Sequence, residues 1–168
     1  MIRFGVLTIS DKGSKGQRID GSGPAIKDRV VLLGGQVVRY EIVPDEIDII
    51  QNKMVEWADA GDVDVILSTG GTGLGPRDVT PEATTPILDR MLPGLAEAMR
   101  MQTFAKTPVS VLSRAVAGVR KKCLIVNLPG SPKAVRECLE PIIPGIVHGV
   151  EMITGSVTEH NIQETQNK

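Results

Sequence analysis

Aromatic side chains are scarce in this sequence. Only 2% of its 168 residues are aromatic, namely Phe4, Tyr40, Trp57 and Phe104. A protein that stacks the bases of single-stranded nucleic acid needs several aromatic faces on one surface. The 19 basic and 20 acidic residues leave a net charge of −1, so no bulk positive field attracts nucleic acid or an anionic membrane. We therefore expect neither kind of partner.

Cysteines and long apolar runs are also few. Two isolated cysteines, Cys123 and Cys138, do not make a disulfide framework, and they favour reduced thiols in the cytoplasm. No nearby histidine supports either of them as a nucleophile. No apolar run approaches the roughly 20 residues that span a bilayer. The N-terminal residues Met1–Thr8 lack the features of a signal peptide, so we expect a cytoplasmic protein.

The order of the apolar segments predicts one α/β domain. Strands are expected at Ile2–Ile9, Gln36–Val43, Val63–Leu67 and Cys123–Leu128, with a small hairpin in Val109–Val119. Helices are expected at Pro24–Leu33, Ile47–Ala60, Thr80–Leu88, Leu95–Ala105 and from Ser131 to about Ile153, and Lys12–Gly23 reads as a loop. This alternation predicts a three-layer αβα sandwich around a mostly parallel sheet. The domain is expected to span residues 1–158, followed by a flexible tail at 159–168.

Polar or glycine-rich motifs follow the predicted strands. Ligands of parallel sheets bind beyond the carboxyl ends of the strands, so these motifs should meet at one edge of the sheet. They are Thr8-Ile-Ser-Asp11, Thr69-Gly-Gly-Thr-Gly73, Leu128-Pro-Gly-Ser-Pro132 and, after a fourth strand, Asp45.

The glycine turn Thr69–Gly73 stands between a predicted strand and the helix start at Thr80-Pro81. Small residues there leave backbone N–H groups accessible, which predicts a cradle for a phosphate or pyrophosphate. A simple tight connection is the alternative. No glycine-lysine-serine/threonine triplet occurs, and Pro76 occupies the place of a third glycine, so the turn is neither a Walker loop nor a dinucleotide fingerprint. Arg77, in the middle of the connection, is expected to act on a ligand.

Two aspartates are the best candidates for metal binding. Asp45 and Asp78 both follow predicted strands, and two carboxylates beside a phosphate site suit Mg²⁺. Phosphoryl and nucleotidyl transfer need such charge neutralisation more than a covalent nucleophile. The alternatives are structural, since Asp45 can cap the helix that starts at Glu46 and Asp78 can be an ordinary residue of an exposed turn.

Other polar residues have both a functional and a structural interpretation. Ser10 and Asp11 can contact a ligand or form a turn after the first strand. Ser131 is expected to cap a helix, and a capped helix start is also an anion site. Lys133 meets either a phosphate or solvent. Ser113-Arg114 interrupts an apolar segment, so the arginine is expected to have an anionic partner.

Taken together, these motifs resemble the MogA/MoaB family of molybdenum-cofactor biosynthesis, the molybdopterin adenylyltransferases. The resemblance covers roughly Ile2–Ile153. It rests on seven motifs in order: Thr8-Ile-Ser-Asp11, Asp20-Gly-Ser-Gly-Pro24, Val43-Pro-Asp-Glu46, Thr69-Gly-Gly-Thr-Gly73, Arg77-Asp-Val-Thr-Pro-Glu-Ala83, Leu112-Ser-Arg-Ala115 and Asn127-Leu-Pro-Gly-Ser-Pro132.

The resemblance implies a molybdopterin-binding-like fold and an activity. Such proteins join molybdopterin, a pterin dithiolene monophosphate, to ATP in the presence of Mg²⁺, and release pyrophosphate. They form homotrimers, or hexamers as dimers of trimers, and pass adenylyl-molybdopterin to a molybdate insertase. Asp45 and Asp78 would then be catalytic, by binding Mg²⁺ and placing the molybdopterin phosphate. The expected substrate-binding and nucleotide-binding residues are Thr8, Ser10, Asp11, Gly70, Gly71, Thr72, Gly73, Arg77, Ser113, Arg114, Pro129, Gly130, Ser131 and Lys133.

Three rival interpretations share this fold. A paralogue can bind molybdopterin without catalysis, although both aspartates are present here. The molybdate insertase has large additional domains, for which 168 residues leave no room. The N-terminal domain of competence/damage-inducible proteins looks like a nucleotide-pyrophosphate hydrolase, and activity on free ADP-ribose without pterin would indicate it.

Overall fold

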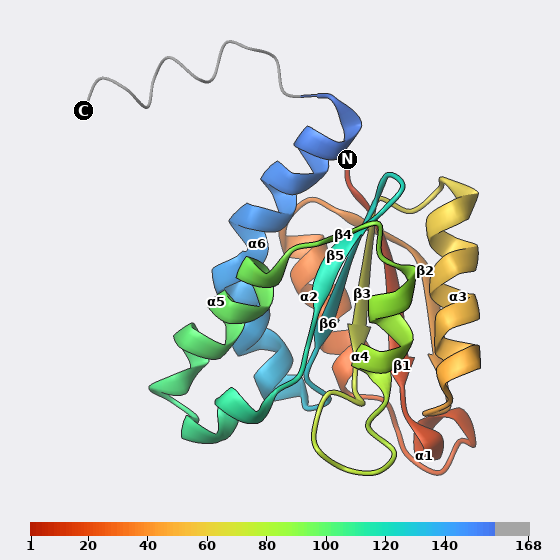
Figure 1. Ribbon diagram of the computed structural model, residues 1–168, viewed down its shortest axis with the longest axis vertical. Coiled ribbons are helices and arrows are strands. Elements are labelled where there is room, and N and C mark those ends of the chain that lie inside the picture. The colour runs from red at the N-terminus through yellow and green to blue at the C-terminus, as the bar shows by residue number, and fades with distance from the viewer. Residues whose placement is uncertain (157–168) are drawn as a thin grey trace.

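The computed structural model describes residues 1–156, which form a mixed β-sheet between layers of helices (Figure 1). The strands are β1 (Arg3–Ile9), β2 (Gln36–Val43), β3 (Val65–Thr69), β4 (Arg90–Met91), β5 (Ala117–Arg120) and β6 (Cys123–Leu128). The α-helices are α1 (Asp11–Ser14), α2 (Ser22–Leu32), α3 (Ile47–Ala60), α4 (Thr80–Thr84), α5 (Pro93–Phe104) and α6 (Pro132–Thr154). Two 3₁₀ helices are η1 (Thr85–Ile87) and η2 (Pro108–Leu112).

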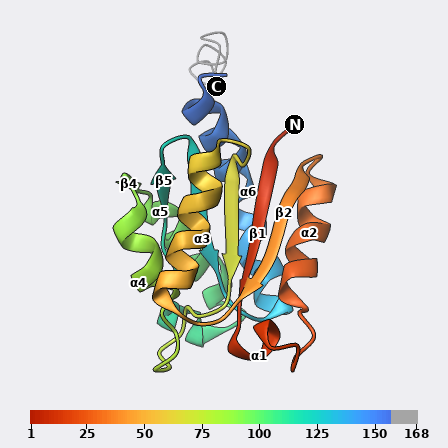
Figure 2. The ribbon, with the colours of Figure 1, turned by 90° about the vertical axis from the view of Figure 1, so that its right-hand side faces the viewer.

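The six strands are ordered β2-β1-β3-β6-β5-β4. The first four are parallel, β5 runs antiparallel to β6, and β4 runs antiparallel to β5. The carboxyl ends of β1, β2, β3 and β6 therefore lie at the same edge of the sheet, shown at the lower end of the molecule in Figures 1 and 2. This confirms the predicted convergence of the strand-end motifs.

Side chains of successive strand residues enter different cores, as the period of two in a strand requires. In β3, Leu67 packs into the core under α2, α5 and α6, while its neighbour Ile66 packs under α3 and α4. In β6, Val126 and Ile125 divide in the same way. The sheet thus has helices on both faces (Figure 2), and the predicted three-layer αβα sandwich is confirmed.

Capping residues set the bounds of the long helices. Helix α6 starts where the Ser131 hydroxyl accepts a hydrogen bond from the Ala134 N–H, and it ends at Gly155 with a φ of 72°. Helix α3 ends in the same way at Gly61, whose φ is 75°. In the described part of the chain, no helix is long and apolar enough to cross a membrane.

Two local predictions are wrong. Within the expected loop Lys12–Gly23, the structure has the end of the short helix α1, capped by Ser10, and the start of α2. The expected hairpin in Val109–Val119 is also absent, since Pro108–Leu112 forms η2. The real hairpin joins β5 to β6 around Lys121, which has a φ of 50°. The prediction of a tail at 159–168 falls outside the described residues.

Candidate functional site

The turn after β3 accepts only glycine at two positions. Gly70 has a φ of 102° and Gly71 a φ of 65°, where side-chain-bearing residues are strained. A Cβ at Gly70 would lie 2.3 Å from the Ile9 carbonyl oxygen, and one at Gly71 would lie 2.3 Å from the Thr80 hydroxyl oxygen. Among residues 1–156, the N–H groups of Gly71, Thr72 and Gly73 donate to no protein acceptor. Consecutive free N–H groups of this kind suit an anion.

A buried chain of hydrogen bonds supports this turn from beneath. The Thr80 hydroxyl donates to the Gly70 carbonyl at 2.8 Å, and the Thr84 hydroxyl donates to the Thr80 carbonyl at 2.8 Å. The Asn127 amide donates to the Ser68 hydroxyl at 2.9 Å and to the Thr84 hydroxyl at 3.1 Å. Because satisfied buried networks of this kind are rigid, the turn is held in one conformation.

The loop between β6 and α6 lies against the glycine turn. The Thr69 hydroxyl donates to the Pro129 carbonyl at 2.7 Å, and a Cβ at Gly130 would lie 3.3 Å from the Gly70 Cα. Ser131 then caps α6, as the sequence predicted. Two strand-end motifs, separated by about 60 residues in sequence, thus form one surface.

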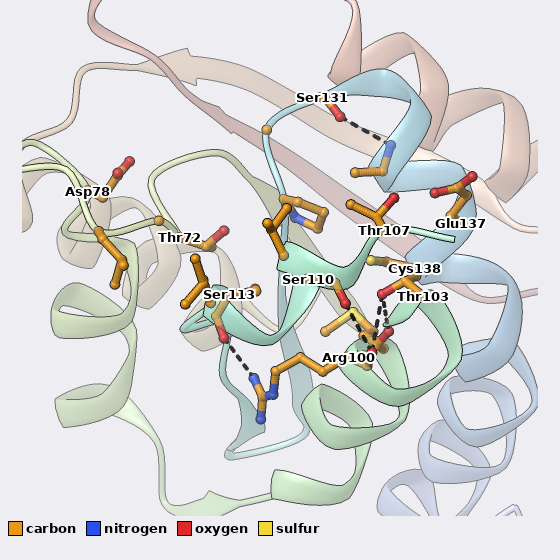
Figure 3. Close-up of a pocket in the computed structure, with 18 of the residues that line it drawn as sticks. Thr72, Asp78, Arg100, Thr103, Thr107, Ser110, Ser113, Ser131, Glu137 and Cys138 are labelled. Atoms are coloured by element: carbon orange, nitrogen blue, oxygen red, sulfur yellow. Dashed lines mark hydrogen bonds between the residues drawn. The ribbon is translucent and has the colours of Figure 1, made fainter. Parts of the chain in front are cut away.

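A cavity with two adjoining lobes opens at this edge of the sheet. The apolar lobe, of about 580 Å³, is lined by side chains that include Leu74, Met99, Val109, Leu112, Ala134 and Cys138 (Figure 3). The polar lobe, of about 600 Å³, is lined by residues that include Thr8, Ser10, Arg18, Asp20, Ser22 and Asp45. The two lobes share Gly71, Asp78, Gly130 and Ser131. Asp78 therefore lies at the boundary between an apolar and a polar compartment.

Asp45 and Asp78 are each held by one carboxylate oxygen. Asp45 Oδ2 accepts the Asp11 N–H at 2.7 Å, and Asp78 Oδ2 accepts the Gly75 N–H at 2.8 Å. The other oxygen of each accepts no hydrogen bond from residues 1–156. Burial, above all, raises the pKa of Asp45, and the carboxylates of Asp11 and Asp78 add to the increase. Glu46, not Asp45, occupies the cap position of α3, so the capping interpretation of Asp45 is wrong.

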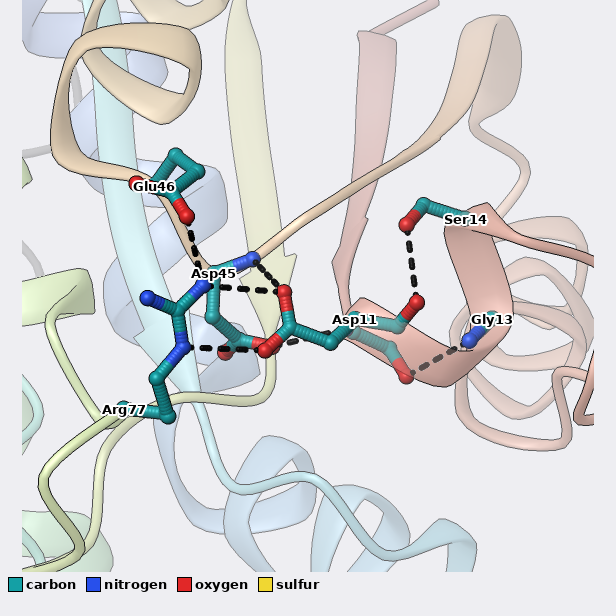
Figure 4. A network of polar contacts seen from close by, with 7 residues as sticks. Asp11, Gly13, Ser14, Asp45, Glu46 and Arg77 are labelled. Carbon is teal, nitrogen blue, oxygen red and sulfur yellow. Dashed lines mark hydrogen bonds and ion pairs between the residues drawn. The ribbon is translucent and has the colours of Figure 1, made fainter.

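Arg77 is bound within the protein. Its guanidinium donates to both oxygens of Asp11 at 3.0 and 3.1 Å, and to Glu46 at 2.6 Å (Figure 4). The Asp45 N–H also donates to Asp11 at 3.1 Å. Bonds from Arg77, and then the Asp45 N–H, lower the pKa of Asp11. Asp11 and Arg77 thus tie the end of β1 to the segment that carries Asp78, and neither lines a lobe.

The structure brings most of the predicted site residues to the cavity. Those that line one or both lobes are Thr8, Ser10, Asp45, Gly70, Gly71, Thr72, Gly73, Asp78, Ser113, Pro129, Gly130 and Ser131. Arg114 lies outside both lobes, where it pairs with Glu82 and donates to the carbonyls of Gly73 at 2.8 Å and Asp78 at 2.6 Å. Its anionic partner is therefore part of the protein. Lys133 is exposed and lines neither lobe.

Asp20 organises the polar lobe, although sequence analysis did not single it out as a site residue. One of its oxygens accepts from the N–H groups of Ser22 and Gly23, and the other accepts from the hydroxyls of Thr8 at 2.6 Å and Tyr40 at 2.7 Å. Burial works to raise the pKa of Asp20, but these hydrogen bonds outweigh it and the pKa is lowered. Burial and the bond to Asp20 raise the pKa of Tyr40 to about 12. The signal was available in Asp20 itself, because an aspartate just before a helix commonly accepts hydrogen bonds from the N–H groups two and three residues later.

Two further lining residues, Arg18 and Glu137, have no recognisable signal of their own in the sequence. Arg18 lies in a glycine-containing loop and Glu137 within α6, and only the fold places them in the polar and apolar lobes. Burial raises the pKa of Cys138, which also lines the apolar lobe, to about 11. Within residues 1–156 there is no group of three or more histidine, cysteine or carboxylate side chains that could hold a metal by itself.

The fold and cavity define a class of α/β protein whose ligand site lies at the carboxyl ends of parallel strands, around a glycine turn. The chain belongs to the family described as "Probable molybdopterin binding domain", whose model matches residues 5–148.

Characterised relatives extend over nearly the whole chain. The chain is 46% identical to a molybdopterin adenylyltransferase of Helicobacter pylori, over 96% of this chain and 95% of that protein. It is 38% identical to the molybdopterin adenylyltransferase of Escherichia coli, over 96% of this chain and 80% of that protein.

Solved structures show the same similarity. The molybdopterin biosynthesis enzyme MoaB of Thermus thermophilus is 51% identical, with a TM-score of 0.87 over 92% of this chain and 98% of that one. The tungsten cofactor synthesizing protein MoaB of Pyrococcus furiosus is 37% identical, with a TM-score of 0.82 over 90% of this chain and 96% of that one.

Proposed function

We propose that this protein is a molybdopterin adenylyltransferase, which transfers AMP from ATP to the phosphate of molybdopterin and releases pyrophosphate. The observation that carries the proposal is the position of Asp78. It lies where the two lobes meet, beside the glycine turn and within electrostatic reach of Asp45. A reaction that joins two substrates through their phosphates needs two compartments that meet at such a point. The similarity to molybdopterin adenylyltransferases over 96% of the chain supports the same activity.

In the proposed reaction, an oxygen of the molybdopterin phosphate attacks the α-phosphorus of ATP. A new P–O bond forms, the bond between the α-phosphorus and the bridging oxygen breaks, and pyrophosphate leaves with that electron pair. The free N–H groups of Gly71, Thr72 and Gly73 donate to phosphate oxygens as negative charge redistributes. Since the network beneath the turn holds these donors in place, they need no reorganisation during the reaction.

Asp45 and Asp78 are proposed to hold Mg²⁺, and the donor set fits this ion. Each aspartate has one oxygen that accepts no hydrogen bond from residues 1–156, and both oxygens are hard ligands. Mg²⁺ is usually bound by one or two carboxylates together with substrate phosphates and water, so a larger protein cluster is not required. When bound, the ion neutralises the charge of the reacting phosphates. The protein's own part is to hold both carboxylates through the N–H groups of Asp11 and Gly75.

The proposal extends to assembly and location. A homotrimer, or a hexamer of two trimers, would cover apolar side chains that are exposed in the single chain, such as Met101 at 73% and Phe104 at 50%. Buried, unpaired cysteines support a reducing compartment such as the cytoplasm. The product would be passed to a molybdate insertase. Light scattering of the purified protein would give the molar mass of the assembly, and a monomer would refute the trimer.

The test is incubation of the purified protein with molybdopterin, ATP and Mg²⁺, with pyrophosphate and adenylylated pterin both measured. Equal amounts of the two products are expected. Pterin binding without either product would instead indicate the non-catalytic paralogue. Hydrolysis of ADP-ribose without pterin would indicate the nucleotide-pyrophosphate hydrolase.

A further inference from the structure

The segment that carries Asp78 is a loop with an exposed tip, and the position of the carboxylate depends on how that loop closes. Asp78 Oδ2 accepts the Gly75 N–H at 2.8 Å, and the Asp78 N–H donates to the Gly75 carbonyl at 3.0 Å. A Cβ at Gly73 or at Gly75 would lie 2.8 Å from the same carboxylate oxygen. The carboxylate thus packs against the backbone of its own loop, so any opening of the loop moves Asp78 away from the boundary of the two lobes.

One side chain from outside closes this loop. The guanidinium of Arg114 donates through Nε to the Gly73 carbonyl at 2.8 Å and through Nη2 to the Asp78 carbonyl at 2.6 Å, so it joins the two ends of the loop. Its third nitrogen, Nη1, pairs with Glu82 on α4, which anchors the guanidinium itself. Within residues 1–156, no other side chain from outside the loop donates a hydrogen bond to residues 73–78.

Arg114 also connects the loop to the glycine turn. Its own N–H donates to the Thr72 carbonyl at 2.9 Å, so its main chain is bonded to the turn while its side chain is bonded to the loop. A guanidinium presents its donors in a rigid fork, which fixes two acceptors relative to each other. Arg114 therefore determines where the Asp78 carboxylate lies relative to the free N–H groups of the turn.

The ion pairs of Arg77 are the other connection between this loop and the rest of the protein. The Arg77 side chain is 55% exposed, against 34% for Arg114. Exposed ion pairs contribute little because solvent and salt screen them, whereas hydrogen bonds from a charged donor to carbonyl groups are stronger than neutral ones. Since Arg114 lines neither lobe, a ligand in either lobe leaves its contacts with the loop in place. Arg114 is thus the main fastening of the loop.

We propose that Arg114 is a positioning residue, which holds the Asp78 carboxylate in place beside the glycine turn without itself contacting a substrate; this inference rests on the proposed function. The family resemblance implied instead that Arg114 contacts the nucleotide or the pterin. The two roles predict different kinetics. Loss of a substrate contact raises KM, whereas loss of positioning lowers kcat and leaves substrate binding unchanged.

The test compares Arg114→Lys with Arg39→Lys. Lysine keeps the positive charge but cannot donate to two carbonyls in the fixed geometry of a guanidinium. Arg39 is the matched control, because its side chain is 30% exposed and pairs with Asp62 at 2.7 Å, but lines neither lobe. At saturating Mg²⁺, Arg114→Lys is expected to lower kcat about tenfold or more, since an ångström-scale misplacement costs up to about hundredfold. The KM for molybdopterin and for ATP should stay within about twofold of wild type, and Arg39→Lys should change none of these values.

Amide hydrogen exchange measured by NMR supplies a readout that requires no turnover. The Gly75 N–H donates to the Asp78 carboxylate, so its exchange rate reports whether the carboxylate keeps its place. Arg114→Lys should speed exchange at Gly75 about tenfold and leave the amides of the buried strand β3 unchanged, and Arg39→Lys should affect neither. If Arg114→Lys does not fold, Glu82→Gln removes only the anchor of the guanidinium and should produce the same changes to a smaller extent.

Three results would overturn the inference. A kcat of Arg114→Lys within about twofold of wild type is the first, and unchanged exchange at Gly75 is the second. A raised KM at unchanged kcat is the third, because Arg114 would then bind a substrate directly. If the wild-type protein forms no adenylylated product, the proposed function fails, while faster exchange at Gly75 in Arg114→Lys would still support the role of Arg114 in closing the loop.

Discussion

The most informative perturbation of the site is Gly71→Ala, because the chain offers a matched control for it. Gly71 has a φ of 65°, and a Cβ there would lie 2.3 Å from the Thr80 hydroxyl and 3.2 Å from Asp45 Oδ1. Gly34 has nearly the same φ, 69°, but a Cβ there would meet nothing within 4 Å. Gly34→Ala therefore isolates the backbone strain of a left-handed residue, and Gly71→Ala adds the steric overlap.

The expected magnitudes follow from these contacts. Left-handed strain costs about 1–2 kcal/mol in either variant. The entropy that alanine removes from the unfolded chain acts equally in both variants and cancels from their difference. In Gly71→Ala the Thr80 hydroxyl must also move away from the Gly70 carbonyl, which leaves buried polar groups unpaired at a cost of about 1–3 kcal/mol. Gly71→Ala should thus be less stable than Gly34→Ala by about 1–3 kcal/mol, the cost of the unpaired buried polar groups.

Urea denaturation at pH 7 would measure both unfolding free energies, and the adenylylation assay would measure turnover. Because the new methyl group lies against the unpaired oxygen of Asp45, Gly71→Ala should also lower kcat/KM by about hundredfold, the usual effect of an ångström-scale misplacement. Gly34→Ala should keep wild-type turnover. Equal destabilisation of the two variants, or normal turnover in Gly71→Ala, would refute the role given to the turn.

Two further predictions concern the polar lobe. Asp20→Asn should lower the unfolding free energy by about 2 kcal/mol at pH 7, through loss of charge-assisted hydrogen bonds. Because the folded-state pKa of Asp20 is lowered, its contribution is present above the unfolded pKa of about 3.9 and is lost as the pH falls further, so the variant and wild type should converge in acid. Denaturation at pH 7 and pH 3 would measure this convergence, with Asp28→Asn on the exposed face of α2 as the control. A loss of unfolding free energy in Asp20→Asn that does not change with pH would contradict the reasoning. Arg18→Ala should raise the KM for ATP about tenfold, because Arg18 is the basic side chain that lines the polar lobe in the described structure. Lys15→Ala, in the same loop, should leave the KM for ATP unchanged. Equal effects of the two variants would indicate only the general electrostatic field of the positive charges in this loop.

The sequence was sufficient to predict the elements whose ends carry strong local signals. Gln36–Val43, Ile47–Ala60 and Cys123–Leu128 form as predicted, because glycine, proline or a change of period marks their ends. The convergence of Asp45 and Asp78 was also predictable, since parallel strands place their carboxyl ends at one edge. These predictions required only local pattern and a topological rule.

The remaining features depend on tertiary contacts. The antiparallel pair β5–β6 reverses at Lys121, where neither glycine nor proline marks a turn, so the hairpin was expected too early in the chain. Arg77 was expected to meet a ligand, but it pairs with Asp11 and Glu46, whose positions beside it depend on the packing of β1 against β2. Glu137 entered no prediction, because a glutamate in a helix is ordinary until the fold places a cavity in front of it.

The most direct test of the central claim is adenylylation by wild type and Asp78→Asn, with Asp28→Asn as the control. Pyrophosphate and adenylylated pterin are measured in the presence of molybdopterin, ATP and Mg²⁺, and circular dichroism checks that each variant is folded. The account predicts that Asp78→Asn loses about a thousandfold or more of the turnover, because the loss of one carboxylate at the boundary of the lobes removes preorganised charge at the reacting phosphates. Turnover of folded Asp78→Asn close to the wild-type value would contradict the account.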